Sequence, residues 1–289
     1  MSKRCEGRYN QCSRCSKWNR SNQLTTPTAL TSHITNMNQT YSYTPGEQAV
    51  WQLLFERQMA QLPGKASQDY LDGISATGFR PDRIPDFEQD LNPRLQKLTG
   101  WRVCAVEGLI PNRAFFELMA NRNFPATTWL RRQDQLEYLP EPDMFHDTFG
   151  HVPMLSNQAF CDFLEALSQI ALHHIESEET IAMISRLYWY TVEFGLIQEG
   201  NHLRIYGGGI LSSVGETTYS LFSPEPKRIP YNVETLLRTP YIIDHFQEQY
   251  FVIESYEQLY QSVAQVESTL EELLVMNHTS GPECIINNE

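Results

Sequence analysis

The sequence predicts a mainly helical fold with a few short strands, of the α+β class. Apolar residues recur three and four positions apart through most of the chain, which is the spacing of one helix face. Runs typical of strands are short, and they are too few for a doubly wound sheet. The 289 residues, 41% of them hydrophobic, suffice for a sizeable core, and no internal repeat is visible. We therefore expect one folded domain.

The chain is expected to divide into an N-terminal tail at 1–42, a folded body at 43–277 and a C-terminal tail at 278–289. The first 40 residues carry six lysines and arginines against one acidic residue, Glu6. Ser, Thr and Asn dominate from Thr25 to Tyr43, which is typical of a linker. We interpret the region as a basic, disordered tail.

Three of the six cysteines lie in that tail, where Cys12 and Cys15 form a CxxC motif. With Cys5 and His33 they offer ligands for zinc, but no second CxxC follows at the spacing of a zinc finger. The other cysteines are scattered, so no disulfide framework is predicted.

The first helix is predicted to begin at Pro45. Thr44 supplies the N-cap hydroxyl, proline suits the first helical position, and Glu47 lies three residues after the cap. Apolar spacing predicts further helices at 66–75, 85–97, 112–121, 157–174, 179–197 and 255–275. Short strands are expected at 101–106, 203–206 and 250–253.

Charge and hydropathy exclude several classes of partner. The net charge of -13 argues against a general nucleic-acid binder, which needs a basic face to displace counterions from phosphates. No run of about 18 apolar residues is present to span a bilayer, and no apolar stretch follows the basic N-terminus. We expect a cytoplasmic protein with neither nucleic-acid nor membrane partners.

The most informative segment contains two histidines, His146 and His151, five residues apart. On an ideal α-helix they would lie about 140° apart around the axis and about 7.5 Å along it, so their rings can converge only on a centre to one side. A metal ion is such a centre, although two unrelated histidines fit the same pattern. The segment is no zincin motif, which requires His-Glu-x-x-His.

Glu193 is a candidate third ligand. It lies in a strongly apolar segment, Leu187–Leu196, where a carboxylate is costly to bury without a partner. Two imidazoles and one carboxylate would form a facial triad, which leaves iron(II) open positions. The alternative is an exposed glutamate on the polar face of an amphipathic helix.

Further motifs occur in the order found in a known family. They are Gly108-Leu109-Ile110 with Phe115-Phe116, Trp129-Leu130-Arg131, the segments 140–153 and 188–196, and the glycine-rich segment 206–216. In this series the chain resembles the aromatic amino acid hydroxylases over roughly 43–257. The resemblance implies a single catalytic domain that binds iron(II) and tetrahydrobiopterin or a related tetrahydropterin. It also implies dioxygen as co-substrate and the hydroxylation of an aromatic ring.

Carried over residue by residue, the resemblance makes His146, His151 and Glu193 the iron ligands and the catalytic centre. It assigns Arg131 to the substrate carboxylate, which a planar guanidinium grips through two parallel hydrogen bonds. The other substrate-binding residues that it implies are Tyr138, Leu139, Pro140, Trp189, Phe194, Gly209 and Ser212. Taken alone, the aromatic members of this set also fit the core of an apolar helix.

For the pterin, the resemblance implies stacking on Phe115. The remaining cofactor-binding residues that it implies are Gly108, Leu109, Ile110, Asp147 and Glu216. Glycines 207–209 permit a close approach of backbone to ligand, although by themselves they would only mark a turn.

Two positions depart from the animal members of the family. Asp147 stands where those tend to have glutamate, and Leu139 stands where animal phenylalanine hydroxylases have threonine. Both resemble the bacterial members. Since the compact single-domain form also resembles bacterial phenylalanine hydroxylases, the predicted reaction is the conversion of L-phenylalanine to L-tyrosine. The alternatives are tryptophan or tyrosine hydroxylation and a non-catalytic metal-binding protein. A monomer or homodimer is expected, because the apolar positions of 255–275 suit packing on the same domain or on a partner.

Overall fold

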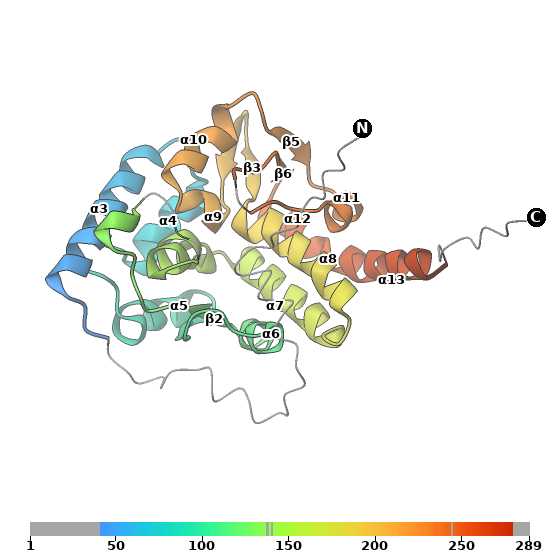
Figure 1. Cartoon of the computed structure of the whole chain (residues 1–289), viewed down its shortest axis with the longest axis horizontal. Helices are drawn as coiled ribbons and strands as arrows, with labels where there is room; N and C mark the ends of the chain where they lie inside the picture. Colours follow the sequence, from blue (N-terminus) through green and yellow to red (C-terminus); the bar gives the residue numbers. More distant parts are fainter. Residues whose placement is uncertain (1–40, 137–138, 140, 244, 280–289) are drawn as a thin grey trace, which may run out of the picture.

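The computed structural model describes residues 41–136, 139, 141–243 and 245–279, and helices form most of that part of the chain (Figure 1). The predicted mainly helical fold with a few short strands is confirmed. Residues 1–40, including the four candidate zinc ligands, lie outside the described residues. No helix in the described ranges combines the length and the apolar character that crossing a bilayer requires.

The α-helices occupy most of the positions that apolar spacing predicts. Their bounds are α3 Pro45–Gln61, α4 Gln68–Thr77, α5 Asn92–Leu98, α6 Asn112–Ala120, α7 Gln158–His173, α8 Glu178–Tyr188, α9 Gly208–Leu211, α10 Val214–Phe222, α11 Val233–Arg238, α12 Tyr256–Gln261 and α13 Val263–Thr279. The predicted start of the first helix is confirmed. Thr44 Oγ1 accepts the Glu47 N–H at 3.2 Å, and Glu47 Oε2 accepts the Thr44 N–H at 2.7 Å.

Within the described part of the chain, three segments are π-helices, at Phe87–Leu91, His146–His151 and Trp189–Glu193. In a π-helix each N–H donates to the carbonyl five residues before it, so residues five apart lie about one turn apart. The Phe194 N–H, for example, donates to the Trp189 carbonyl at 2.9 Å. The prediction of uninterrupted α-helix over 85–97 and 179–197 was therefore wrong at these turns.

The described residues also form two small sheets. In the first, β1 (Arg102–Ala105) and β2 (Asn123–Ala126) are parallel. The second has the order β4-β3-β6-β5, with β3 and β4 antiparallel and β6 parallel to both β3 and β5. Its strands are β3 Leu196–Glu199, β4 His202–Ile205, β5 Lys227–Pro230 and β6 Gln249–Ile253.

One predicted helix was too long, and another is divided in two. Leu196 and Ile197, predicted to end the helix over 179–197, instead belong to β3, where they pair with β4 and β6. Apolar spacing cannot detect this change, because a buried strand and a buried helix end are equally apolar. The predicted helix 255–275 is two helices, α12 and α13, with the break at Ser262.

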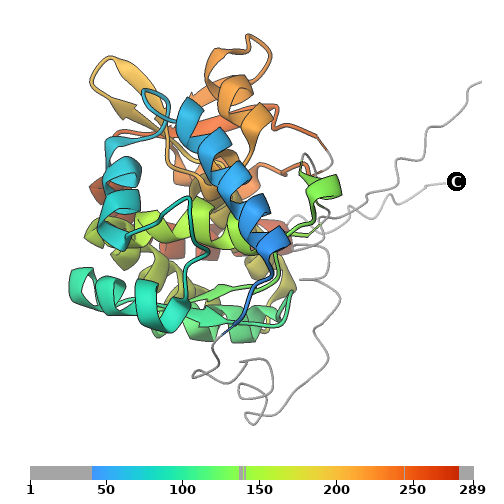
Figure 2. The same ribbon diagram turned by 90° about the vertical axis from the view of Figure 1, so that its left-hand side faces the viewer.

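An aromatic cluster fastens the segment of the two histidines to the first helix. Phe145 and Phe149 stack at 4.7 Å between ring centroids, and Trp51 of α3 meets Phe145 edge-on at 5.5 Å. Phe55 of α3 meets Phe149 edge-on at 5.4 Å. Figure 2 shows α3 crossing one face of the molecule diagonally. The two histidines thus extend from a turn that is anchored in the core on its opposite side.

Candidate metal centre

His146 and His151 come together because their turn is a π-helix. Five residues apart, they begin and end His146–His151, and their Nε2 atoms lie 3.3 Å apart. An α-helix would have separated them around its axis, so the wider turn resolves the difficulty that their spacing posed. His151 is 3% exposed, which leaves its ring little freedom.

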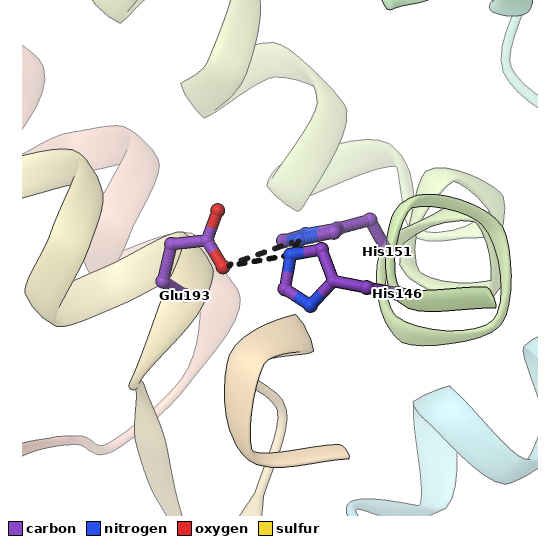
Figure 3. Close-up of side chains that lie close together, drawn as sticks. All are labelled: His146, His151 and Glu193. Carbon is purple, nitrogen blue, oxygen red and sulfur yellow. Dashed lines mark hydrogen bonds and ion pairs between the residues drawn. The ribbon is translucent and has the colours of Figure 1, made fainter. Parts of the chain in front are cut away.

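Glu193 closes the site from a second π-helix. Its Oε2 lies 3.5 Å from His146 Nε2 and 3.3 Å from His151 Nε2. Figure 3 shows both imidazoles extending from one ribbon toward the carboxylate on another. Within the described residues, these three form the only cluster of at least three histidine, cysteine or acidic side chains able to hold a metal.

The three donor atoms fit a metal ion. Atoms separated by 3.3–3.5 Å can all lie about 2.0–2.2 Å from one ion, the usual length of a bond from a divalent metal to imidazole nitrogen or carboxylate oxygen. Three protein donors leave further coordination positions of such an ion for other ligands.

The electrostatics of the site suit a cation. Burial by itself would raise the pKa of Glu193, but the imidazoles of His151 and His146 outweigh it and hold that pKa well below its usual range. A buried carboxylate that stays anionic needs positive charge beside it, and a metal ion supplies that charge.

Ser212 fixes the tautomer of His146. Its Oγ lies 2.9 Å from His146 Nδ1 and donates to the Gly208 carbonyl at 2.9 Å. A serine has one hydroxyl proton, so an Oγ that donates to Gly208 must accept from Nδ1–H. The lone pair of His146 is then on Nε2, the atom that faces Glu193.

The glycine-rich segment packs its backbone directly on the metal ligands. A Cβ added to Gly208 would lie 2.4 Å from His151 Cε1, and one added to Gly207 would lie 2.5 Å from the Glu193 carbonyl oxygen. The alternative that these glycines only mark a turn does not describe the segment, because Gly208 begins helix α9. The positions exclude a side chain because it would occupy the space of the ligands.

Arg131 and Asp143 form a buried ion pair beside the histidines. Arg131 Nε and Nη2 donate to the two carboxylate oxygens at 2.8 Å each, and Nη1 donates to the Leu136 carbonyl at 3.2 Å. A guanidinium has five N–H groups, so these contacts leave one on Nη1 and one on Nη2 for a further acceptor. Asp143 Oδ1 also accepts the His146 N–H at 3.0 Å.

Trp189 and Phe194 lie together, as the first residue of the π-helix Trp189–Glu193 and the residue that follows it. Their ring centroids are 4.6 Å apart, and Tyr241 stacks on Trp189 at 4.6 Å with 20° between the ring planes. Gly209 lies against the same group, since a Cβ there would be 3.0 Å from Phe194 Cζ. Leu139 is half-buried, whereas Tyr138 and Pro140 lie outside the described residues.

The residues expected at the pterin occupy varied environments. Phe115 is buried and meets Tyr188 edge-on at 5.6 Å, while Ile110 is buried and Gly108 and Leu109 are half-buried. Asp147 is fully buried, and its Oδ2 accepts the Thr127 N–H at 2.8 Å.

Glu216 is buried at the start of α10. Its Oε1 accepts from the Tyr250 hydroxyl at 2.7 Å and from the Gln247 N–H at 3.3 Å. Burial raises the pKa of Glu216 to about 7, against the lowering effect of both donors.

Sequence reasoning missed several residues that support the site. Asp143 had a detectable signal, since a carboxylate three residues before His146 is typical of an N-cap. Gln247 and Tyr241 had none, because they approach Trp189 from more than 50 positions away in the sequence.

Comparisons with known proteins agree on one family. A family model described as biopterin-dependent aromatic amino acid hydroxylase matches residues 16–285. The phenylalanine-4-hydroxylase of Ralstonia nicotianae is 49% identical over 208 residues, which span 72% of this chain and 66% of that protein. That of Chromobacterium violaceum is 47% identical over 206 residues, which span 71% of this chain and 69% of that protein.

Solved structures give the same result. The Chromobacterium violaceum phenylalanine hydroxylase with bound oxidized Fe(III) has a TM-score of 0.78 at 46% identity, covering 81% of this chain and 84% of that one. The same enzyme with iron and phenylalanine bound has a TM-score of 0.76 at 44% identity, with the same coverage.

Proposed function

The chain belongs to the biopterin-dependent aromatic amino acid hydroxylases, and on this basis we propose that it converts L-phenylalanine to L-tyrosine with dioxygen and a tetrahydropterin. The observation that carries the proposal is the triangle of donor atoms on His146, His151 and Glu193, 3.3–3.5 Å apart. Two imidazoles and one carboxylate on one side of an ion are the ligand set of non-haem iron(II) oxygenases.

When bound, the iron and the tetrahydropterin would activate dioxygen and supply the electrons that its reduction requires. The protein holds the donor atoms in place before the metal arrives. Ser212 holds His146 in the tautomer whose lone pair is on Nε2. Gly208 leaves space for the ring of His151. Asp143 caps the turn that bears both histidines. Such preorganisation removes the cost of ordering the ligands when the metal binds.

For the substrate, we propose that Arg131 grips the carboxylate of the amino acid through its two remaining N–H groups. Its pairing with Asp143 supports this role, because the guanidinium plane is already fixed at the site. The substrate ring is proposed to lie beside Trp189 and Phe194, with the other substrate-binding residues being Tyr138, Leu139, Pro140, Gly209 and Ser212.

For the cofactor, we propose that Phe115 stacks on the pterin ring while the backbone of Gly108, Leu109 and Ile110 lines its edge. Asp147 and Glu216 are proposed as carboxylates on the cofactor side. Asp147 is held by the Thr127 N–H, and Glu216 is held by the Tyr250 hydroxyl, so both carboxylates have fixed positions from which to face the cofactor.

The proposal also covers the extent of the catalytic domain, its compartment in the cell and its assembly state. The catalytic body is proposed to span 43–277, between a basic tail at 1–42 and a short tail at 278–289. The enzyme is proposed to act in the cytoplasm as a monomer or a homodimer. Light scattering on the purified full chain distinguishes the two assembly states.

The test is tyrosine formation from phenylalanine with iron(II), tetrahydrobiopterin and oxygen. We expect turnover by the wild type, loss of both turnover and bound iron in Glu193→Ala, and neither loss in Glu234→Ala, an exposed glutamate on α11. Preferred turnover of competing tryptophan would move the proposal to another substrate of the same family. Iron binding without any turnover would support the non-catalytic alternative.

A further inference from the structure

Gln247 joins three parts of the chain through three hydrogen bonds. It is 2% exposed and lies just before β6. Its Oε1 accepts from the Trp189 indole Nε1 at 3.0 Å, and its Nε2 donates to the Ile242 carbonyl at 2.8 Å. Its backbone N–H donates to Glu216 Oε1 at 3.3 Å. The side chain is therefore held at both ends of its amide and at its backbone.

The bond to Trp189 determines the orientation of the indole. An indole has a single polar group, Nε1–H, which is a donor only, so one acceptor fixes the rotation of the ring in its plane. Tyr241 stacks on the same ring at 20° and 4.6 Å, and Phe194 lies 4.6 Å away at 38°. The stacked rings fix the plane of Trp189, and Gln247 fixes the direction in which its edge points.

Only an amide meets both requirements at this position. The Trp189 Nε1–H needs an acceptor, and the Ile242 carbonyl needs a donor. Glutamine supplies one of each, a carboxylate supplies acceptors only, and an apolar side chain supplies neither. Glu216 anchors the backbone of Gln247, because the Oε1 atom that accepts the Gln247 N–H is itself held by the buried Tyr250 hydroxyl at 2.7 Å.

We propose that Gln247 is a specificity-determining positioning residue: it orients the Trp189 indole and so sets which aromatic ring the substrate slot accepts. The inference rests on the proposed function, since it takes Trp189 as part of the substrate slot. It adds a role for a residue whose side chain hydrogen-bonds to Trp189 and to the Ile242 carbonyl and not to a candidate metal ligand.

The test compares phenylalanine with tryptophan as substrates of the same iron-loaded protein. The measured quantity is the ratio of the two kcat/KM values, from which shared effects of iron, pterin and oxygen cancel. Gln247→Met keeps the length of the side chain but loses both polar atoms. We expect it to change the ratio about 10-fold, because the buried Nε1–H of Trp189 is left without its acceptor. The change should lie mainly in the KM for phenylalanine.

Three further variants separate orientation from general destabilisation. Gln247→Glu keeps the acceptor for Trp189, so its ratio should stay within about twofold of the wild type although its unfolding temperature falls. Trp189→Phe removes the indole N–H, and adding Gln247→Met to it should leave the ratio unchanged. The matched control is Gln249→Leu, two residues along, whose Nε2 reaches Tyr190 Oη at 3.5 Å instead.

The outcomes are decisive in both directions. The proposal is overturned if Gln247→Met changes the ratio equally in the wild type and in Trp189→Phe. It is also overturned if Gln249→Leu changes the ratio as much as Gln247→Met does. If Gln247→Met does not fold, a shifted ratio in Gln247→Glu also overturns it, and an unshifted ratio with a lower unfolding temperature supports it. A wild type that makes no hydroxylated product from either amino acid refutes the proposed function instead, and this result is visible before any variant is made.

Discussion

Asp143 binds Arg131 through both carboxylate oxygens, at 2.8 Å from Nε and 2.8 Å from Nη2, while one of these oxygens also accepts the His146 N–H at 3.0 Å. One fully buried side chain thus links the residue proposed for the substrate carboxylate with the turn that bears two metal ligands. Because the pair and the cap share one carboxylate, the positions of both sites depend on it.

Asp143→Asn should therefore weaken substrate binding and stability together. The amide keeps one acceptor oxygen but turns an NH₂ group toward the guanidinium. The buried Arg131 cation therefore loses one of its two hydrogen bonds to this side chain and also the opposite charge. We expect the free energy of unfolding to fall by about 3 kcal/mol and kcat/KM for phenylalanine to fall about 100-fold. Denaturant unfolding and steady-state kinetics measure the two effects.

The neighbouring pair provides the control for this variant. Arg132 binds Asp134 in the same side-on manner, but both side chains are exposed. Solvent screens such a pair, so Asp134→Asn should leave both measurements close to wild type. Equal effects of the two substitutions would contradict a special role for Asp143.

Gly208→Ala should lower the affinity for iron. The new methyl group would lie 2.4 Å from His151 Cε1, so the imidazole or the α9 backbone must move. We expect a cost of about 1–3 kcal/mol from overpacking and a weaker iron complex by about 10-fold or more. Titration of the apoprotein with iron(II) measures the affinity. Gly46→Ala, whose nearest neighbour would be Thr44 Oγ1 at 3.8 Å, should bind iron as the wild type does.

Ser212→Ala should weaken iron binding without a large loss of stability. The substitution removes the hydroxyl that accepts from Nδ1 of His146, so the ring can adopt the wrong tautomer or rotate. Loss of such a supporting hydrogen bond typically costs 10–100-fold in metal affinity. Ser213→Ala is the matched control, because Ser213 caps α10 and is expected to affect unfolding by about 1 kcal/mol but not iron affinity. An unchanged iron affinity in Ser212→Ala would refute the tautomer argument.

Glu216 should make stability fall as the pH rises from about 4.5 to about 7. Burial raises the pKa of Glu216 from 4.5 to about 7 in the folded protein. Below about 4.5 the group is protonated in both states. Between the two values the unfolded chain loses its proton while the folded protein keeps it, so the folded state becomes relatively less stable, by about 3 kcal/mol in all.

The comparison with Glu216→Gln isolates this effect. The amide oxygen can still accept from Tyr250 and Gln247, but it does not titrate. The difference in unfolding free energy between wild type and variant should therefore shift in favour of the variant across this pH window and level off above it. A difference that is independent of pH would show that Glu216 titrates at its ordinary pKa.

The sequence identified the candidate ligands better than it predicted the turns that bear them. His146, His151 and Glu193 were assigned through the family resemblance, because their spacing and apolar setting alone left other interpretations open, and the structure brings their donor atoms together. The π-helices of His146–His151 and Trp189–Glu193 were not predicted, since apolar spacing does not distinguish a wide turn from an α-turn within five residues. On an α-helix, His146 and His151 would lie too far apart around the axis to share an ion easily, and the π-helix removes this conflict.

Contacts distant in sequence account for most of what was missed. Nothing near Gln247 indicates a bond to Trp189, because that bond arises only when the segment before β6 packs beside the π-helix Trp189–Glu193. Likewise, Gly208 is restricted by His151, 57 positions earlier, and not by its own local conformation. Strands β2, β3 and β5 escaped prediction, and two of them, β2 and β5, pair only with strands about 20 positions away in the sequence.

The ligand triangle draws on two segments separated by 42 positions, His151 and Glu193. An ion bound to both acts as a cross-link that exists only in the folded chain, because the unfolded chain would have to close that long loop to recreate it. Iron should consequently protect the whole domain against heat in proportion to its supply. Once the metal exceeds its dissociation constant, every tenfold increase in free iron should add about 1.4 kcal/mol to the free energy of unfolding. Cells that are short of iron would then hold not only less active enzyme but also less durable enzyme.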